Sequence, residues 1–211
     1  LLFTIYLSLF RKDYFNKPSS ITMLYVLVTI FPIIVSLMIR HNLFSIYILP
    51  LTTAAIFVRM FMDSRTAFVT HCTIVLICAA AVKYQYEFII MQIVAGMVAI
   101  YSLRELTQRS QVFKTAILVG LSYIAVYFSL QLMQNSSLNK LDADMYYHFV
   151  VNAVLLLLAY PLMYIIEKTF GFTSNVTLFE LSNTNRGILR NLSEIAPGTF
   201  QHSITVANLA V

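Results

Sequence analysis

Histidine is the side chain in this sequence that could do the most chemistry, because imidazole binds metals and titrates near neutral pH. The chain has four: His41, His71, His148 and His202. A lone His on a helix is more often a structural residue, and one imidazole cannot hold a catalytic metal pair. The residue types alone therefore leave the role of each histidine open.

His71 lies inside a strongly hydrophobic run. An ionisable group within a membrane is costly and is a functional-site hypothesis by default. The other reading is a neutral imidazole bonded to another helix, which is favoured because no carboxylate lies deep in any run. That absence also argues against an ion-coupled carrier. Gln92, Gln131 and Asn152 could bond between helices.

The composition is that of a membrane protein. Hydrophobic residues make up 59% of the 211 residues and charged residues 11%, with a mean hydropathy of +0.79. A soluble domain carries roughly 25% charged residues. A spanning helix takes about 20 apolar residues, so the chain has room for about seven. Cys72 and Cys78 fall about 120° apart around one predicted helix and cannot bond to each other within it.

The hydrophobic runs are separated by short polar breaks, which predicts an all-α membrane protein with a seven-helix transmembrane region over residues 1–166. The first run is too short to cross. We expect it to be the inner end of a helix that starts earlier, after an extracellular part. A connector is expected over 167–182 and the start of a cytoplasmic domain over 183–211. The runs are 1–10, 21–39, 43–62, 66–82, 87–103, 115–133 and 146–166.

The basic residues predict the orientation, because cytoplasmic loops are enriched in Lys and Arg. If the loop after the first run is cytoplasmic, 11 of the 14 basic residues lie inside, and so does the tail from Glu167 onward. The net charge of +5 is spread over helix ends, which does not indicate a nucleic-acid partner. The inside set is Arg11, Lys12, Lys17, Arg59, Arg65, Arg104, Arg109, Lys114, Lys168, Arg186 and Arg190, and the outside set is Arg40, Lys83 and Lys140.

Pro32, Pro50 and Pro161 interrupt the predicted helices. Each removes a backbone donor and tends to kink its helix. A static kink is favoured over a hinge, because membrane helices tolerate Pro. Two pairs of small residues could let helices approach closely, namely Ala95 with Ala99 and Ala116 with Gly120.

The tail predicts two short helices. Asn183 or Thr184 can cap a helix that runs from Asn185 to about Ile195. Pro197-Gly198 would end it, and Thr199 can cap a second helix that carries His202. The first helix has a narrow apolar stripe that needs a protein partner, made of Ile188, Leu189, Leu192 and Ile195.

Two stretches of the tail, Thr177–Asn183 and Ala196–Ser203, occur in this order after the last hydrophobic run. Together with Leu189 and Val206–Ala210 they resemble the seven-transmembrane HD family. These bacterial membrane proteins have an extracellular domain, seven helices and a cytoplasmic HD phosphohydrolase. Its characterised members are cyclic di-AMP phosphodiesterases. Over the hydrophobic runs the resemblance is one of architecture.

The resemblance implies that residues 183–211 begin the HD domain and that His202 is the first ligand of a two-metal centre, with iron or manganese. Paired ions stabilise the attacking and leaving oxygens of a phosphodiester together. In the family the other ligands, including a His-Asp pair, come later, and no His is followed by Asp here. We therefore expect this fragment to be inactive alone.

The main hypothesis is the sensor or anchor region of a membrane-bound cyclic di-AMP phosphodiesterase in the bacterial plasma membrane. Its partners would be the bilayer, the extracellular domain and the rest of the HD domain, with a homodimer left open. The alternative is a small-solute transporter or ligand-binding membrane module without an enzyme.

Overall fold

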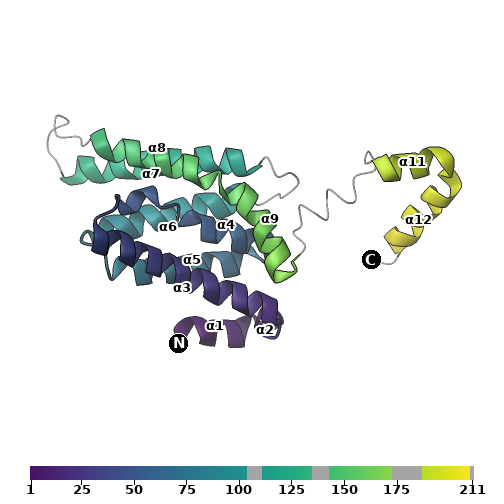
Figure 1. Ribbon diagram of the computed structural model, residues 1–211, viewed down its shortest axis with the longest axis horizontal. Coiled ribbons are helices and arrows are strands. Elements are labelled where there is room, and N and C mark those ends of the chain that lie inside the picture. The colour runs from purple at the N-terminus through teal and green to yellow at the C-terminus, as the bar shows by residue number, and fades with distance from the viewer. Residues whose placement is uncertain (104–110, 135–142, 173–186, 210–211) are drawn as a thin grey trace.

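The computed structural model describes residues 1–103, 111–134, 143–172 and 187–209. Every regular element in these residues is a helix, which confirms the all-α prediction. In the bundle, α6 packs between α5 and α7, with α3 against α5 and α8 against α7 (Figure 1). The elements are α1 (Leu2–Phe10), α2 (Lys12–Phe15), α3 (Pro18–His41), η1 (Ile46–Ile48), α4 (Thr52–Phe61), α5 (Ser64–Ala79), α6 (Gln85–Ser102), α7 (Gln111–Gln134), α8 (Ala143–Leu156), α9 (Ala159–Phe170), α11 (Gly187–Ile195) and α12 (Pro197–Leu209).

Three of the described helices are long and apolar enough to cross a membrane: α3, α6 and Gln111–Met133 of α7. A fourth span results if α8 and α9, which are bent by 41° at their break, count as one. Two further apolar stretches, Ile46–Phe61 and Ser64–Ala79, are shorter. The membrane character of the bundle is thus confirmed, while seven crossings stay a prediction.

The hydrophobic run 43–62 is not one helix, so the expectation of a single crossing helix there was wrong. It forms the one-turn helix η1, and α4 begins only at Thr52. The residue before a proline avoids the helical region, and Leu49 is extended at φ −72° and ψ 119°. Pro50 itself offers no N–H to a helical ladder. The break therefore follows from local chemistry at one dipeptide.

The other two prolines have different outcomes. Pro32 lies inside α3, which continues as one helix to His41. Pro161 lies in the first turn of α9, just after the break that separates α9 from α8. Its missing N–H leaves the Leu157 carbonyl without its helical donor, and the Tyr160 N–H bonds that carbonyl at 3.1 Å instead.

Asn152 of α8 supports the broken segment before α4. Its Nδ2 donates to the carbonyl oxygens of Tyr47 at 2.8 Å and Leu49 at 3.1 Å. The side chain is fully buried. Irregular backbone at membrane depth is tolerated only where protein or water satisfies it. The prediction that Asn152 bonds between helices is therefore confirmed, and its partners are backbone carbonyls rather than another side chain.

The core of the bundle forms around α4. Thr52–Val58 and Met60 are buried, and α4 packs against α5, α6 and α9. A helix that is buried on all sides belongs to a protein core. Beside it, the ring of Phe149 contacts those of Tyr47, Tyr123 and Tyr127 at centroid distances of 6.1, 5.6 and 5.3 Å.

Replacing Asn152 with Leu should destabilise the bundle by about 1–3 kcal/mol, because one buried and one half-buried carbonyl lose their donor. Thermal unfolding in detergent measures the loss. Ser122→Ala is the control, since the Ser122 hydroxyl bonds only to Val119 of its own helix among the described contacts, and it should change stability by less than about 0.5 kcal/mol. An Asn152→Leu protein as stable as the wild type would contradict this role.

Candidate functional site

His202 lies in the second turn of α12 and is exposed. The predicted end of the preceding helix at Ile195 is confirmed. The predicted cap at Thr199 was wrong, because α12 begins at Pro197. Proline suits the first helical position, where its missing N–H would be unpaired anyway. The stretch Thr177–Asn183 lies outside the described residues.

The described residues hold no group of three His, Cys, Asp or Glu side chains that could bind a metal ion. His41 ends α3, His71 is buried in α5 and His148 lies in α8. Within the described part of the chain, His202 is therefore a single potential ligand on an exposed helix face. These residues do not form a two-metal centre, and no step of hydrolysis follows from them.

A chain of buried polar groups links three helices. His71 Nε2 of α5 lies 2.8 Å from the backbone carbonyl oxygen of Gln92 in α6, so Nε2 carries the proton and donates. The Tyr123 hydroxyl of α7 donates to Gln92 Oε1 at 2.7 Å. All three side chains are buried. The reading of His71 as bonded to another helix is confirmed, and so is Gln92 as an interhelical residue.

His71 packs directly over Gly96 of α6. A Cβ at Gly96 would lie 2.2 Å from His71 Cδ2 and 2.3 Å from Nε2, which no real side chain tolerates. Gly120 of α7 is the milder case, where a Cβ would lie 3.1 Å from the Ala153 Cβ of α8. The small-residue pairs predicted the close approach of helices at Gly120 but not the one at Gly96. The sequence feature that could have indicated Gly96 is a lone glycine one turn after Gln92 in an apolar helix.

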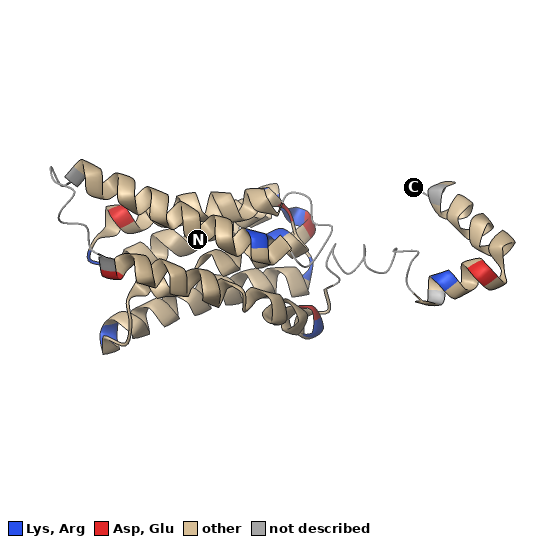
Figure 2. Ribbon diagram, turned by 90° about the horizontal axis from the view of Figure 1, so that it is seen from above, with Lys and Arg blue, Asp and Glu red and all other residues tan. Residues whose placement is uncertain are grey.

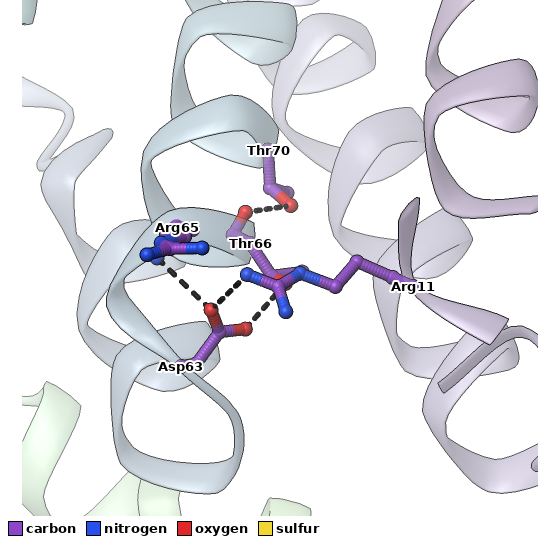
Figure 3. A network of polar contacts seen from close by, with 5 residues as sticks. All are labelled: Arg11, Asp63, Arg65, Thr66 and Thr70. Atoms are coloured by element: carbon purple, nitrogen blue, oxygen red, sulfur yellow. Dashed lines mark hydrogen bonds and ion pairs between the residues drawn. The ribbon is translucent and has the colours of Figure 1, made fainter. Parts of the chain in front are cut away.

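A polar network joins α1 to the segment Phe61–Ser64, the α4–α5 corner (Figure 3). Arg11 Nη2 lies 2.6 Å from Asp63 Oδ2. The Thr66 hydroxyl donates to Asp63 Oδ1, and the Arg65 backbone N–H donates to Oδ2 at 3.2 Å, which caps α5. A hydrogen bond with Tyr6 raises the pKa of the Arg11 guanidinium, desolvation opposes this, and Asp63 adds to the rise. Arg11 therefore stays charged beside Asp63.

The same corner receives the end of α9. Gly171 ends that helix in the left-handed region at φ 67°, which glycine adopts without a Cβ penalty. The ring of Phe172 then stacks on Phe61 with centroids 5.3 Å apart. Phe61 lies two residues before Asp63. Neither the ion pair of Arg11 with Asp63 nor this aromatic stack was predicted from the sequence, because each joins residues that are far apart along the chain.

Residues 1–174 match the family described as 7TM receptor with intracellular HD hydrolase. The chain is 30% identical over 173 residues to the cyclic-di-AMP phosphodiesterase PgpH of Bacillus subtilis, covering 78% of this chain and 24% of that protein. It is 26% identical over 192 residues to PgpH of Listeria monocytogenes, covering 87% of this chain and 26% of that protein. The chain thus spans about a quarter of the length of these relatives. No solved structure matches it significantly.

The contact between His71 and Gly96 predicts a stability effect. Gly96→Ala should cost about 1–3 kcal/mol, because the new methyl group overlaps the imidazole. In a His71→Ala background the same change should cost less, since the ring is gone. Thermal unfolding can be followed with a thiol-reactive dye in a Cys72→Ser background, because Cys78 is buried in the folded state whereas Cys72 is only half-buried.

Gly120→Ala serves as the comparison and should cost less than Gly96→Ala, because its neighbour is a single methyl group at 3.1 Å. Equal costs of Gly96→Ala with and without His71 would exclude the imidazole as the cause.

Proposed function

The chain belongs to the family of 7TM receptors with an intracellular HD hydrolase, and on this basis we propose that it is the membrane sensor or anchor region of a metal-dependent HD phosphodiesterase that hydrolyses cyclic di-AMP. The observation that carries the proposal is the family match across the whole bundle, from residue 1 to 174. The relatives named as cyclic-di-AMP phosphodiesterases support the substrate. Their greater length supports a larger enzyme with further domains.

We propose that the bundle makes seven crossings and leaves the tail in the cytoplasm of a bacterial plasma membrane. Charged residues gather at the two ends of the bundle, and the segments between them carry few (Figure 2). Basic residues favour the cytoplasmic side. Those at helix ends on the side where α9 ends are Arg11, Lys12, Lys17, Arg59, Arg65, Lys114 and Lys168, against Arg40 and Lys83 on the other side.

The transporter alternative gains no support from the described core. The buried polar side chains there belong to Ser, Thr, His, Gln and Asn. Ion-coupled carriers use acidic or basic side chains within the membrane as relays. Among the described polar groups, His71, Gln92 and Asn152 instead bond to other elements of the bundle, as expected of a packed scaffold.

We further propose that the bundle acts on the HD domain through the α4–α5 corner. Asp63 of this corner holds Arg11 at the end of α1, and Phe61 holds Phe172 at the start of the connector. A shift of α1 would therefore reach the connector over a short path. The HD domain is covalently joined to the bundle through this connector.

His202 should be a metal ligand in the full-length enzyme. His202→Ala should lower the metal content and abolish hydrolysis of cyclic di-AMP, because a two-metal reaction needs both ions in place. Elemental analysis and a turnover assay on the purified full-length protein measure the two effects, and they also report whether the metal is iron or manganese.

His41→Ala is the matched control, since His41 ends α3 at the opposite end of the bundle from α9. It should keep full metal content and activity. A His202→Ala enzyme with normal metal content and turnover would refute the assignment and leave His202 as an ordinary helix residue.

The stack between Phe61 and Phe172 should set the hydrolysis rate of the full-length enzyme. Such an aromatic pair is worth about 0.5–1.5 kcal/mol, so Phe172→Ala should shift a two-state equilibrium by about two- to tenfold. A Gly-Ser insertion after Phe172 provides the uncoupled reference rate. The Phe172→Ala rate should move toward that reference.

Tyr164→Ala on α9 is the control, because this side chain is 60% exposed, and its rate should equal the wild-type rate. If Phe172→Ala leaves the rate unchanged while the insertion alters it, the stack is not the coupling contact.

A further inference from the structure

An open groove lies between α5 and α6 at the end of the bundle where α9 also ends. Its volume is about 530 Å³. The walls come from the first turns of α5 and the last turns of α6. The lining residues are Ser64, Arg65, Phe68, Met97, Ile100 and Tyr101.

The groove has one apolar part and one charged end. Phe68 and Met97 are 38% and 46% exposed, so their side chains form an accessible apolar surface. Arg65 is exposed at the second position of α5. Tyr101 is exposed near the end of α6.

The positive charge of Arg65 is available to a ligand. The nearby carboxylate, Asp63, is bound by the Arg11 guanidinium and the Thr66 hydroxyl. Arg65 contacts Asp63 through its backbone N–H (Figure 3). Asp63 is thus paired with Arg11, and the Arg65 guanidinium has no partner among the described contacts, which leaves its positive charge at the end of an apolar groove.

We propose that this groove binds one anionic phospholipid. An acyl chain lies against Phe68, Met97 and Ile100, and the phosphate meets Arg65, with the Ser64 hydroxyl beside it. A lipid supplies the apolar chain and the negative charge in one molecule. A neighbouring protein helix would need an acidic residue placed opposite Arg65. The proposal is independent of the enzymatic function proposed above, because it rests on the bundle alone.

The test is native mass spectrometry of full-length protein titrated with dioleoyl-phosphatidylglycerol or dioleoyl-phosphatidylcholine. The wild type should bind one phosphatidylglycerol molecule more tightly than phosphatidylcholine. Arg65→Gln should weaken phosphatidylglycerol binding by about fivefold, the effect of one basic residue near an anionic headgroup. It should leave phosphatidylcholine binding unchanged.

Two further variants separate charge from shape. Lys114→Gln removes another exposed charge from the same end of the bundle, outside the groove, and should leave binding unchanged. Met97→Trp fills the apolar part and should weaken both lipids without removing a charge. Thermal unfolding of each variant checks that the bundle is intact.

Equal binding of phosphatidylglycerol to Arg65→Gln and to the wild type overturns the proposal. So does a lipid-free dimer that Met97→Trp converts to a monomer, because a second copy would then occupy the groove.

Discussion

A hydrocarbon layer offers no hydrogen bonds, so each backbone group that lies within it must find its partner inside the protein. The segment before α4 departs from helical geometry at Leu49 and Pro50. The Tyr47 and Leu49 carbonyls of this segment accept hydrogen bonds from Asn152, which lies more than 100 residues further along the chain. This one amide joins α8 to the segment that leads into α4. Because α4 is enclosed by α5, α6 and α9, the position of α4 in turn constrains the rest of the bundle.

The same constraint governs the polar side chains. His71, Gln92 and Tyr123 each bond across a helix interface. Such bonds are individually worth about 0.6 kcal/mol in membrane proteins, so they fix register more than they stabilise. Gly96 brings α5 and α6 close enough for the first of them. A functional reading of His71 is not needed to explain its burial.

At the end of the bundle where most of the basic residues lie, water and lipid headgroups can solvate charged side chains. There Asp63 caps α5 while it pairs with Arg11. Phe61, two residues earlier, meets the start of the connector at Phe172. Within the described residues, the α4–α5 corner thus contacts both Arg11 at the end of α1 and Phe172 just after α9. The family match ends at residue 174, just after these contacts.

The sequence by itself determined that the chain is a membrane protein, that its secondary structure is helical and to which family it belongs. Its composition indicated a membrane protein, its hydrophobic runs predicted helices, and its tail motifs resembled one family, whose model matches residues 1–174. The tertiary structure decided which residues meet. Three prolines share one local chemistry, yet Pro32 stays within a helix, Pro50 precedes one and Pro161 lies in the first turn of one. Hydrophobic periodicity is local and reports helices, whereas the partners of Asn152, Gly96 and Asp63 depend on distant segments, and no local pattern encodes them.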